Sequence, residues 1–239
     1  MRYVLLGLSI VIAACGEDSS GPAEGFGCVD DPLPTTAPSL VTVNGQIFAN
    51  ALSPGPVSNA IVIAFRVGAP GTDTLAFDTS LTSGHYAVSI ATGGTPVNGY
   101  LKVTHSGQLD TYAYPSRPLA ANLTTNVLMP TQNELDFLGV AVGVTQSAGN
   151  GFIGVVVKDC FGATVAGATV STSPAGTVRY NSGTTPSATA MSTSTDGVAY
   201  VFNVPAGDVT VRANGGGETL RQHVVTARAG TVTLTEIQP

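Results

Sequence analysis

The sequence predicts an all-β protein made of two consecutive β-sandwich domains with a short helix between them. Gly, Ala, Val, Thr and Ser dominate a chain of 239 residues in which 10% of residues are charged. Short apolar stretches with an alternating pattern are separated by Gly and Pro turns, as in sandwiches. A similar order of strands and turns begins at residue 41 and again at residue 151.

The N-terminus has the layout of a secretion signal. Arg2 is followed by an apolar stretch that is too short to span a bilayer. The stretch ends in Ile12-Ala13-Ala14-Cys15, which resembles the lipobox of bacterial lipoproteins. The resemblance implies that residues 1–14 are removed as a signal peptide and that Cys15 is lipidated. The alternative is an ordinary secretory signal whose cleavage site includes a cysteine.

Residues 15–38 are polar and contain Gly, Ser and Pro, which predicts a flexible tether. Several acyl chains on Cys15 would anchor the protein durably in a membrane. In lipoproteins an Asp after the cysteine often signals retention in the inner membrane, and this chain has Gly16 there. The resemblance therefore implies a lipid-anchored protein of the bacterial cell envelope, in the outer membrane.

Two further cysteines, Cys28 and Cys160, remain after removal of the signal peptide. A disulfide between them is permitted outside the cytoplasm. It would tie the tether to the second half of the chain, and closing so long a loop could stabilise the fold by up to about 5 kcal/mol. The alternative is two unpaired cysteines.

The strands are predicted from their periodicity. In the first domain, residues 39–130, apolar side chains fill every position of 61–65, so both faces of this strand are expected to be buried. Residues 86–90 alternate between large apolar and small residues. In the second domain, residues 146–239, apolar residues of 209–213 share one face, and Val232 and Leu234 alternate with threonines.

A helix is predicted for residues 132–142, within a linker over 131–145. Thr131 precedes Glu134 by three residues, which is the spacing of a capping box. Leu135, Leu138 and Val142 then follow at helical spacing and are expected to share one face.

Residues 154–213 resemble the carboxypeptidase regulatory-like domain. The matching motifs are "TVAGATV" at 164–170, "STDGVAYVF" at 194–202 and "NVPAGDVTV" at 203–211. The family implies a transthyretin-like Greek-key β-sandwich that serves as an accessory or structural module without catalytic residues. The insertion at 175–191 departs from the family pattern, and the first domain matches it by analogy alone.

Neither a zinc site nor a catalytic serine is predicted. His85, His105 and His223 are far apart in sequence and have no further ligand at zinc spacing. His105 is expected on a strand face with Leu101 and Val103. The sequence has no G-x-S-x-G motif. We therefore expect no enzymatic activity, no cofactor and no metal ion.

Calcium is a further alternative, because Asp159, Asp196 and Asp208 could converge at one end of a sandwich. The sequence lacks the Asp-rich loop of an EF-hand. Asp before Gly is common in turns, since Asp bonds nearby backbone groups and Gly accepts positive φ. Asp196-Gly197 is therefore interpreted as a turn.

Residues 98–118 gather aromatic and charged side chains in a chain otherwise poor in both. The candidate ligand-binding residues are Tyr100, Asp110, Tyr112, Tyr114 and Arg117. Tyr side chains are useful on binding surfaces because they join an apolar face to a polar tip. The alternative is that Tyr112 and Tyr114 cover the edge of a sheet. Pro115 and Pro118 favour this alternative, because prolines protect an edge strand from pairing with other strands.

The expected function follows from these points. The formal net charge of −6 argues against nucleic acid as a partner. The chain is expected to be a non-catalytic envelope lipoprotein that acts as a structural or protein-binding module. Its partners would be the membrane, through the lipid anchor, and an envelope protein or glycan. The alternative function is a carbohydrate-binding module that uses residues 98–118.

Overall fold

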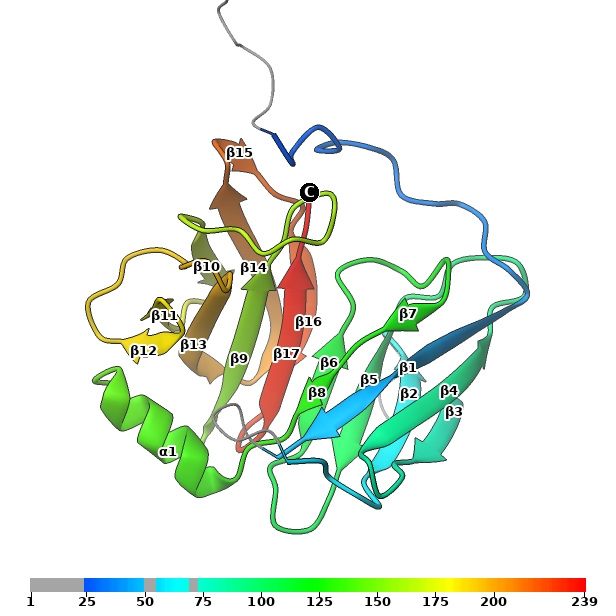
Figure 1. The fold of residues 1–239 in the computed structure, drawn as a ribbon, viewed down its shortest axis with the longest axis horizontal. Coiled ribbons are helices and arrows are strands. Elements are labelled where there is room, and N and C mark those ends of the chain that lie inside the picture. The colour runs from blue at the N-terminus through cyan, green and yellow to red at the C-terminus, as the bar shows by residue number, and fades with distance from the viewer. Residues whose placement is uncertain (1–23, 50–54, 69–72) are drawn as a thin grey trace, which may run out of the picture.

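A computed structural model describes residues 24–49, 55–68 and 73–239 (Figure 1). The predicted signal peptide (residues 1–14), Cys15 and the first part of the predicted tether lie outside these residues. The described residues form a mostly β structure with one α-helix. The strands before the helix are β1 (Leu40–Phe48), β2 (Ile61–Arg66), β3 (Thr74–Thr79), β4 (His85–Ala91), β5 (Gly99–Thr104), β6 (Thr111–Tyr114), β7 (Leu123–Thr124) and β8 (Val127–Leu128).

The helix, α1 (Gln132–Ala141), separates these strands from a second set. The second set consists of β9 (Asn150–Val157), β10 (Thr169–Ser173), β11 (Thr177–Ser182), β12 (Thr185–Ser187), β13 (Val198–Pro205), β14 (Gly207–Gly215), β15 (Glu218–Thr219), β16 (His223–Ala227) and β17 (Val232–Ile237).

A nine-stranded sheet runs through both halves of the chain, in the order β12-β11-β13-β9-β17-β6-β5-β2-β3. The last strand, β17, lies near its middle, parallel to both neighbours (Figure 1). Leu234 of β17 pairs with Ala113 of β6 on one side and with Gly154 of β9 on the other. The two halves are therefore joined by backbone pairing, which the prediction of two domains in tandem did not include.

Two smaller sheets cover opposite faces of this long sheet. Strands β4, β1, β7 and β8 form one of them, whose core includes Val43 and Val88 packed with Leu101 and Ala113 of the long sheet. Strands β10, β14, β15 and β16 form the other, in whose core Val209 and Val211 pack with Ile153 and Val155. Ala113 and its neighbours Tyr112 and Tyr114 point to opposite faces, so the two cores lie on opposite sides of the long sheet.

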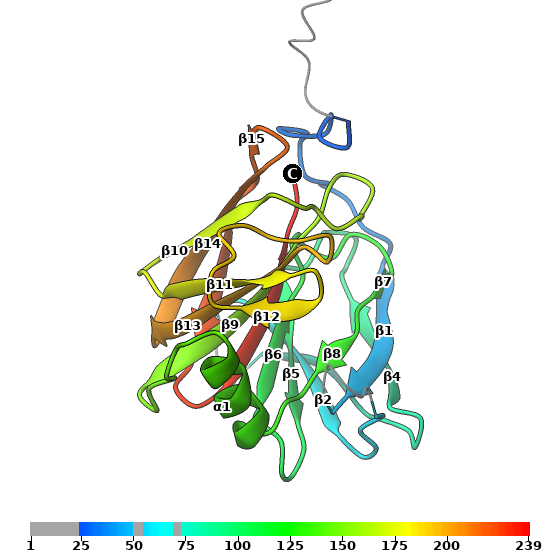
Figure 2. The ribbon, with the colours of Figure 1, turned by 60° about the vertical axis from the view of Figure 1, so that its left-hand side comes forward.

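The helix prediction is confirmed. Thr131 is the N-cap, its Oγ1 accepts a hydrogen bond from the Glu134 amide at 3.2 Å, and Glu134 Oε2 accepts one from the Thr131 amide at 2.7 Å. The helix ends at Ala141, one residue earlier than predicted. Leu135 packs with Phe202 and Val232, so α1 covers the long sheet beside the first small sheet (Figure 2).

The alternating strands are confirmed, whereas the prediction for residues 61–65 is partly wrong. Tyr86, Val88 and Ile90 are buried, and so are Val209, Val211 and Ala213. Ile61, however, is 49% exposed. Residues 62 and 64 of β2 face the first core, but the second small sheet does not reach the opposite face at Ile61. Burial on that face depends on a strand distant in sequence, and the local pattern does not contain this information.

The insertion at 175–191 forms an addition to the sheet. It supplies all of β11 and β12, which extend the long sheet beyond β13. The edge strand β12 has three residues, one of which is Pro186. A short edge strand with a proline offers few free backbone groups, so this edge is protected from pairing with other chains.

We predict that blocking β17 unfolds both halves together. Thr233 is the second residue of β17 and pairs with Tyr112 on one side and Ile153 on the other. Thr233→Pro removes its amide hydrogen and introduces a ring into a central strand. The free energy of unfolding should fall by about 3 kcal/mol or more. Chemical denaturation followed by circular dichroism measures this change.

The matched control is Thr233→Val, which keeps the backbone amide and removes the hydroxyl that donates to the Thr226 carbonyl at 3.2 Å. It should cost about 1 kcal/mol. Equal effects of the two substitutions would contradict a central role for the backbone pairing of β17.

Candidate functional site

The predicted ligand-binding tyrosines come together, but they are buried. Tyr100 of β5 and Tyr112 and Tyr114 of β6 are 8%, 8% and 3% exposed. Their rings lie on the face of the long sheet that packs into the second core. The expectation of an exposed aromatic cluster is therefore wrong, because the second half of the chain covers residues that the first half contributes.

Arg228, in the turn between β16 and β17, covers these rings. Its guanidinium carbon lies 3.9 Å from the Tyr112 ring centroid and 5.4 Å from that of Tyr100. Its Nη1 donates to the Tyr114 hydroxyl at 3.3 Å and to the Thr226 carbonyl at 3.0 Å. The cation is thus held against aromatic faces and also satisfies its hydrogen bonds. Sequence reasoning missed Arg228, since it lies more than 100 residues from the tyrosines.

The aromatic cluster is continuous across three strands. Tyr100 stacks on Tyr114 with ring centroids 4.9 Å apart, and on Phe65 of β2 with centroids 5.6 Å apart. The alternative that these tyrosines cover a sheet edge is also wrong, because β6 pairs with β5 on one side and with β17 on the other. Tyr112 and Tyr114 lie at the junction of the two halves and fill the space between them.

Asp110 and Arg117 lie on either side of β6 and form separate contacts. Asp110 pairs with Lys102 at 3.2 Å, and its carbonyl accepts a hydrogen bond from the Val232 amide at 3.0 Å. Arg117 Nη2 donates to the Pro239 carbonyl oxygen at 2.7 Å. The five predicted residues therefore do not form one ligand-binding surface. Asp110 and Arg117, which flank β6, instead contact the first residue of β17 and Pro239 beyond its end.

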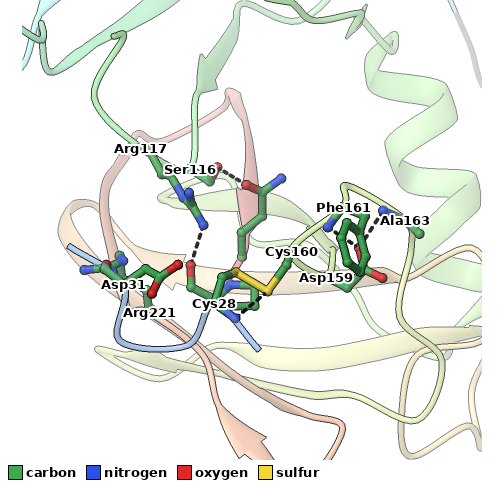
Figure 3. The surroundings of a disulfide bond; sticks show 11 residues. Cys28, Asp31, Ser116, Arg117, Asp159, Cys160, Phe161, Ala163 and Arg221 are labelled. Atoms are coloured by element: carbon green, nitrogen blue, oxygen red, sulfur yellow. Dashed lines mark hydrogen bonds between the residues drawn. A yellow bond between two sulfur atoms is a disulfide. The ribbon is translucent and has the colours of Figure 1, made fainter. Parts of the chain in front are cut away.

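The predicted disulfide is confirmed. Cys28 and Cys160 are bonded, and their Cα atoms are 5.9 Å apart (Figure 3). The Cys160 amide donates to the Gly25 carbonyl at 2.9 Å. Asp159 Oδ1 accepts hydrogen bonds from the amides of Phe161 and Ala163 and so holds the turn that carries Cys160.

The segment around Cys28 is docked on the second half of the protein. Phe26 is 5% exposed and belongs to the second core, where its ring occupies the space beside Gly216. Arg221 Nη2 donates to the Asp31 carbonyl at 2.6 Å (Figure 3). The prediction of a flexible tether over 15–38 is therefore wrong for residues 25–31. The predicted disulfide gave one attachment of this segment, but the pattern of polar and small residues did not reveal that Phe26 is buried in the second core.

The aspartates considered as calcium ligands hold turns and strands. Asp196 Oδ1 accepts from the Val198 amide at 3.1 Å, and Gly197 has a φ of +68°. Asp208 accepts from the Thr226 hydroxyl at 3.0 Å. The turn interpretation of Asp196-Gly197 is confirmed. Within the described ranges, no three His, Cys, Asp or Glu side chains are grouped so that they could hold a metal ion.

The three histidines lie in different local environments. His85 is the first residue of β4, and His105 follows the end of β5 instead of lying in the strand. His223, the first residue of β16, bonds the Thr235 hydroxyl through Nδ1 at 2.8 Å and lies edge-on to Tyr114. Burial lowers the pKa of His223 to about 4, because the charged imidazolium is disfavoured away from water.

Comparison with known proteins does not identify a family. No family model matches the chain, and no curated protein matches it. A streptococcal ancillary pilin is similar over 84% of this chain and 62% of the pilin, with 10% identity and a TM-score of 0.29. The shaft pilin spaA from Lactobacillus rhamnosus GG is similar over 86% of this chain and 98% of the pilin, with 12% identity and a TM-score of 0.25.

An enzyme is also among the similar structures. Hydroxyquinol 1,2-dioxygenase from Pseudomonas putida DLL-E4 is similar over 43% of this chain and 63% of the enzyme, with 11% identity and a TM-score of 0.28. With TM-scores this low, these similarities carry no argument about function. In the part of the chain that the structure describes, none of the helical structure is long and apolar enough to cross a bilayer.

We predict that Arg228→Ala lowers the free energy of unfolding by about 2 kcal/mol, because it removes a cation from two ring faces and two hydrogen bonds. The control is Arg66→Ala. Arg66 pairs with Asp73 at 2.9 Å, and both side chains are 46% exposed, so this loss should cost less than about 1 kcal/mol. Denaturant titration of both variants distinguishes the two arginines, and equal costs would contradict the role given to Arg228.

A second prediction concerns the stability of the fold at acidic pH. Because the pKa of His223 is about 4 in the folded protein and 6.5 is the ordinary value, the unfolded chain binds a proton first as the pH falls. The stability contributed by neutral His223 is complete above pH 6.5 and is lost as the pH falls toward 4. His223→Gln should remove this part of the pH dependence, whereas His105→Gln should retain it. Urea midpoints measured from pH 7.5 to 4 test this, and identical profiles for the two variants would contradict it.

Proposed function

We propose that this protein is a non-catalytic lipoprotein of the bacterial cell envelope, anchored through Cys15, whose folded body is a structural or protein-binding module. The observation that carries the proposal is the Cys28–Cys160 disulfide. Disulfides persist outside the reducing cytoplasm, which agrees with an exported chain. The same bond fixes the segment nearest to Cys15 against the folded body.

The organisation of the body supports a mechanical or scaffolding role. One sheet continues through both halves, and its central strand is paired on both sides. The aromatic side chains considered for ligand binding contribute to packing at the junction, as Tyr112 under the Arg228 guanidinium illustrates. Such a body keeps its two halves in a fixed relation, which suits a spacer or a platform for partners.

The finer parts of the proposal rest on sequence resemblance. They are the location in the outer membrane and the assignment of both halves to transthyretin-like sandwiches related to the carboxypeptidase regulatory-like domain. The alternative of a glycan-binding segment at 98–118 is not favoured. A sugar would need the ring faces of Tyr100, Tyr112 and Tyr114, and these faces are buried in the second core.

The docked segment also implies an orientation on the membrane. Residues 16–24 separate Cys15 from the docked Gly25, and nine residues span at most about 30 Å. The disulfide would therefore lie at the end of the body nearest to the membrane. Helix α1 lies at the opposite end, in both views of the molecule (Figures 1 and 2).

Metabolic labelling with palmitate tests the anchor. The native chain and a Cys28→Ala variant should incorporate the label, and Cys15→Ala should not. Cys28→Ala is the matched control, because it removes a cysteine nearby without touching the lipobox. Equal labelling of native and Cys15→Ala protein would refute the anchor.

Single tryptophans test the orientation, since the chain has no Trp of its own. Phe161, beside the disulfide, is 84% exposed, and Phe137 on α1 is 66% exposed. In vesicles that contain brominated lipids, the fluorescence of Phe161→Trp should be quenched more than that of Phe137→Trp in the lipidated protein. Equal quenching, or the reverse order, would show that the disulfide end does not face the membrane.

A further inference from the structure

An open groove lies on the outer face of the sheet formed by β4, β1 and β7. Its volume is about 540 Å³, which falls within the range of small-molecule sites. Alternate residues of β1 and β4 face away from the core and line the groove, together with residues around β3 and β7. The polar lining residues are Asn44, Gln46, Asp78, His85, Thr124 and Asn126.

The amide side chains of the groove are each held by one hydrogen bond within the protein. Asn44 Oδ1 accepts from the Thr124 hydroxyl at 2.8 Å. Asn126 Oδ1 accepts from the backbone amide of Gln46 at 3.0 Å. Gln46 Nε2 donates to the Ser83 carbonyl at 2.8 Å. Each amide therefore has a defined orientation before any ligand arrives.

The two titratable side chains are held in the same way. Asp78 Oδ2 accepts from the Ala87 amide at 2.8 Å, which also closes the sandwich between β3 and β4. His85 Nδ1 bonds the Ser83 hydroxyl at 2.9 Å. Each side chain thus uses one polar atom for the fold.

The other polar atom of each side chain has no hydrogen-bond partner among the described residues. These atoms are Asn44 Nδ2, Asn126 Nδ2, Gln46 Oε1, Asp78 Oδ1 and His85 Nε2. They comprise two amide donors, two oxygen acceptors and an imidazole nitrogen that can serve as either. Since the side chains are already oriented, a ligand that bonds them loses little additional side-chain entropy.

This mixture of donors and acceptors indicates which class of ligand the groove can bind. An anion would be repelled by the Asp78 carboxylate, and the lining contains neither Lys nor Arg to offset that repulsion. An extended peptide would need apolar pockets for its side chains, and Leu81 is the one large aliphatic residue of the lining. A hydroxyl group both donates and accepts, so a set of sugar hydroxyls can satisfy both kinds of atom at once.

We propose that this groove binds a neutral saccharide. Asn44 and Asn126 donate to its hydroxyl oxygens, and Gln46 and Asp78 accept from its hydroxyl hydrogens. Leu81, which is largely exposed at the rim, offers apolar area to the C–H face of a sugar ring. None of these residues belongs to segment 98–118, and the proposal does not depend on the lipid anchor.

The test uses Asn126→Asp, which keeps the Oδ1 acceptor for the Gln46 amide and replaces the Nδ2 donor with an acceptor. Asn122→Asp is the matched control. Asn122 Oδ1 accepts from the Thr42 amide at 2.9 Å on the same strand, but Asn122 does not line the groove. Both substitutions add one negative charge and preserve the same type of bond to β1.

The intact protein, labelled with ¹⁵N, is titrated with maltohexaose, cellohexaose, xylohexaose, mannohexaose and chitohexaose, and with an uncharged hexapeptide. We expect saturable amide shifts at Gln46, Ala87 and Asn126 with at least one sugar. Asn126→Asp should weaken that binding about tenfold, because the carboxylate cannot donate the hydrogen bond that Asn126 Nδ2 gives to a sugar hydroxyl, whereas Asn122→Asp should stay within about twofold.

Three results would overturn the proposal. The first is that no sugar of the panel causes saturable shifts at about 10 mM. The second is that the shifts lie outside β1, β4 and residues 124–126, or that the two variants weaken binding equally. The third is that the hexapeptide occupies the groove and the sugars do not.

Discussion

The pairing of β17 between β6 and β9 is the interaction on which the remaining structure depends. A parallel strand at this position gives each half a neighbour that it would otherwise lack, and it converts two sheets into one. Threonines fill the face of β17 toward the second core, where Thr233 and Thr235 are buried and bond nearby carbonyls. Small β-branched side chains suit a strand that is covered on both faces.

The aromatic cluster follows from this pairing. Once β6 and β17 are neighbours, Tyr112 and Tyr114 face the second core, which β16 helps to cover. The side chain of Arg228, from the turn that leads into β17, packs against these two tyrosines. A guanidinium fits there because its flat face packs on the rings while its edge donates hydrogen bonds. Residues that look like a binding surface in the linear sequence thus become the contact between halves.

Local patterns predicted the local features of this protein. The capping box at Thr131, the alternation in β4 and β14, and the Asp196-Gly197 turn all depend on neighbours within a few residues. The sequence did not predict the shared sheet, the exposure of Ile61 or the burial of the tyrosines, since each depends on pairing over 100 residues or on where a covering sheet ends. The groove was missed for the same reason, because β1, β4 and residues 124–126 meet only in the fold.

The disulfide also determines how the molecule would respond to force. Cys28 and Cys160 are separated by 132 residues of chain but by a single covalent bond across the surface. Tension applied on the N-terminal side of Cys28 passes through the sulfur atoms to Cys160 and enters the second half there. The intervening chain, which includes the whole first set of strands and α1, lies outside that covalent path. A pull between an N-terminal attachment and the C-terminal part of the chain would therefore load the covalent segment from Cys160 through β10 to β17. Strands β1 to β9 and α1 would receive load only through non-covalent contacts, such as the pairing of β17 with β6 and β9.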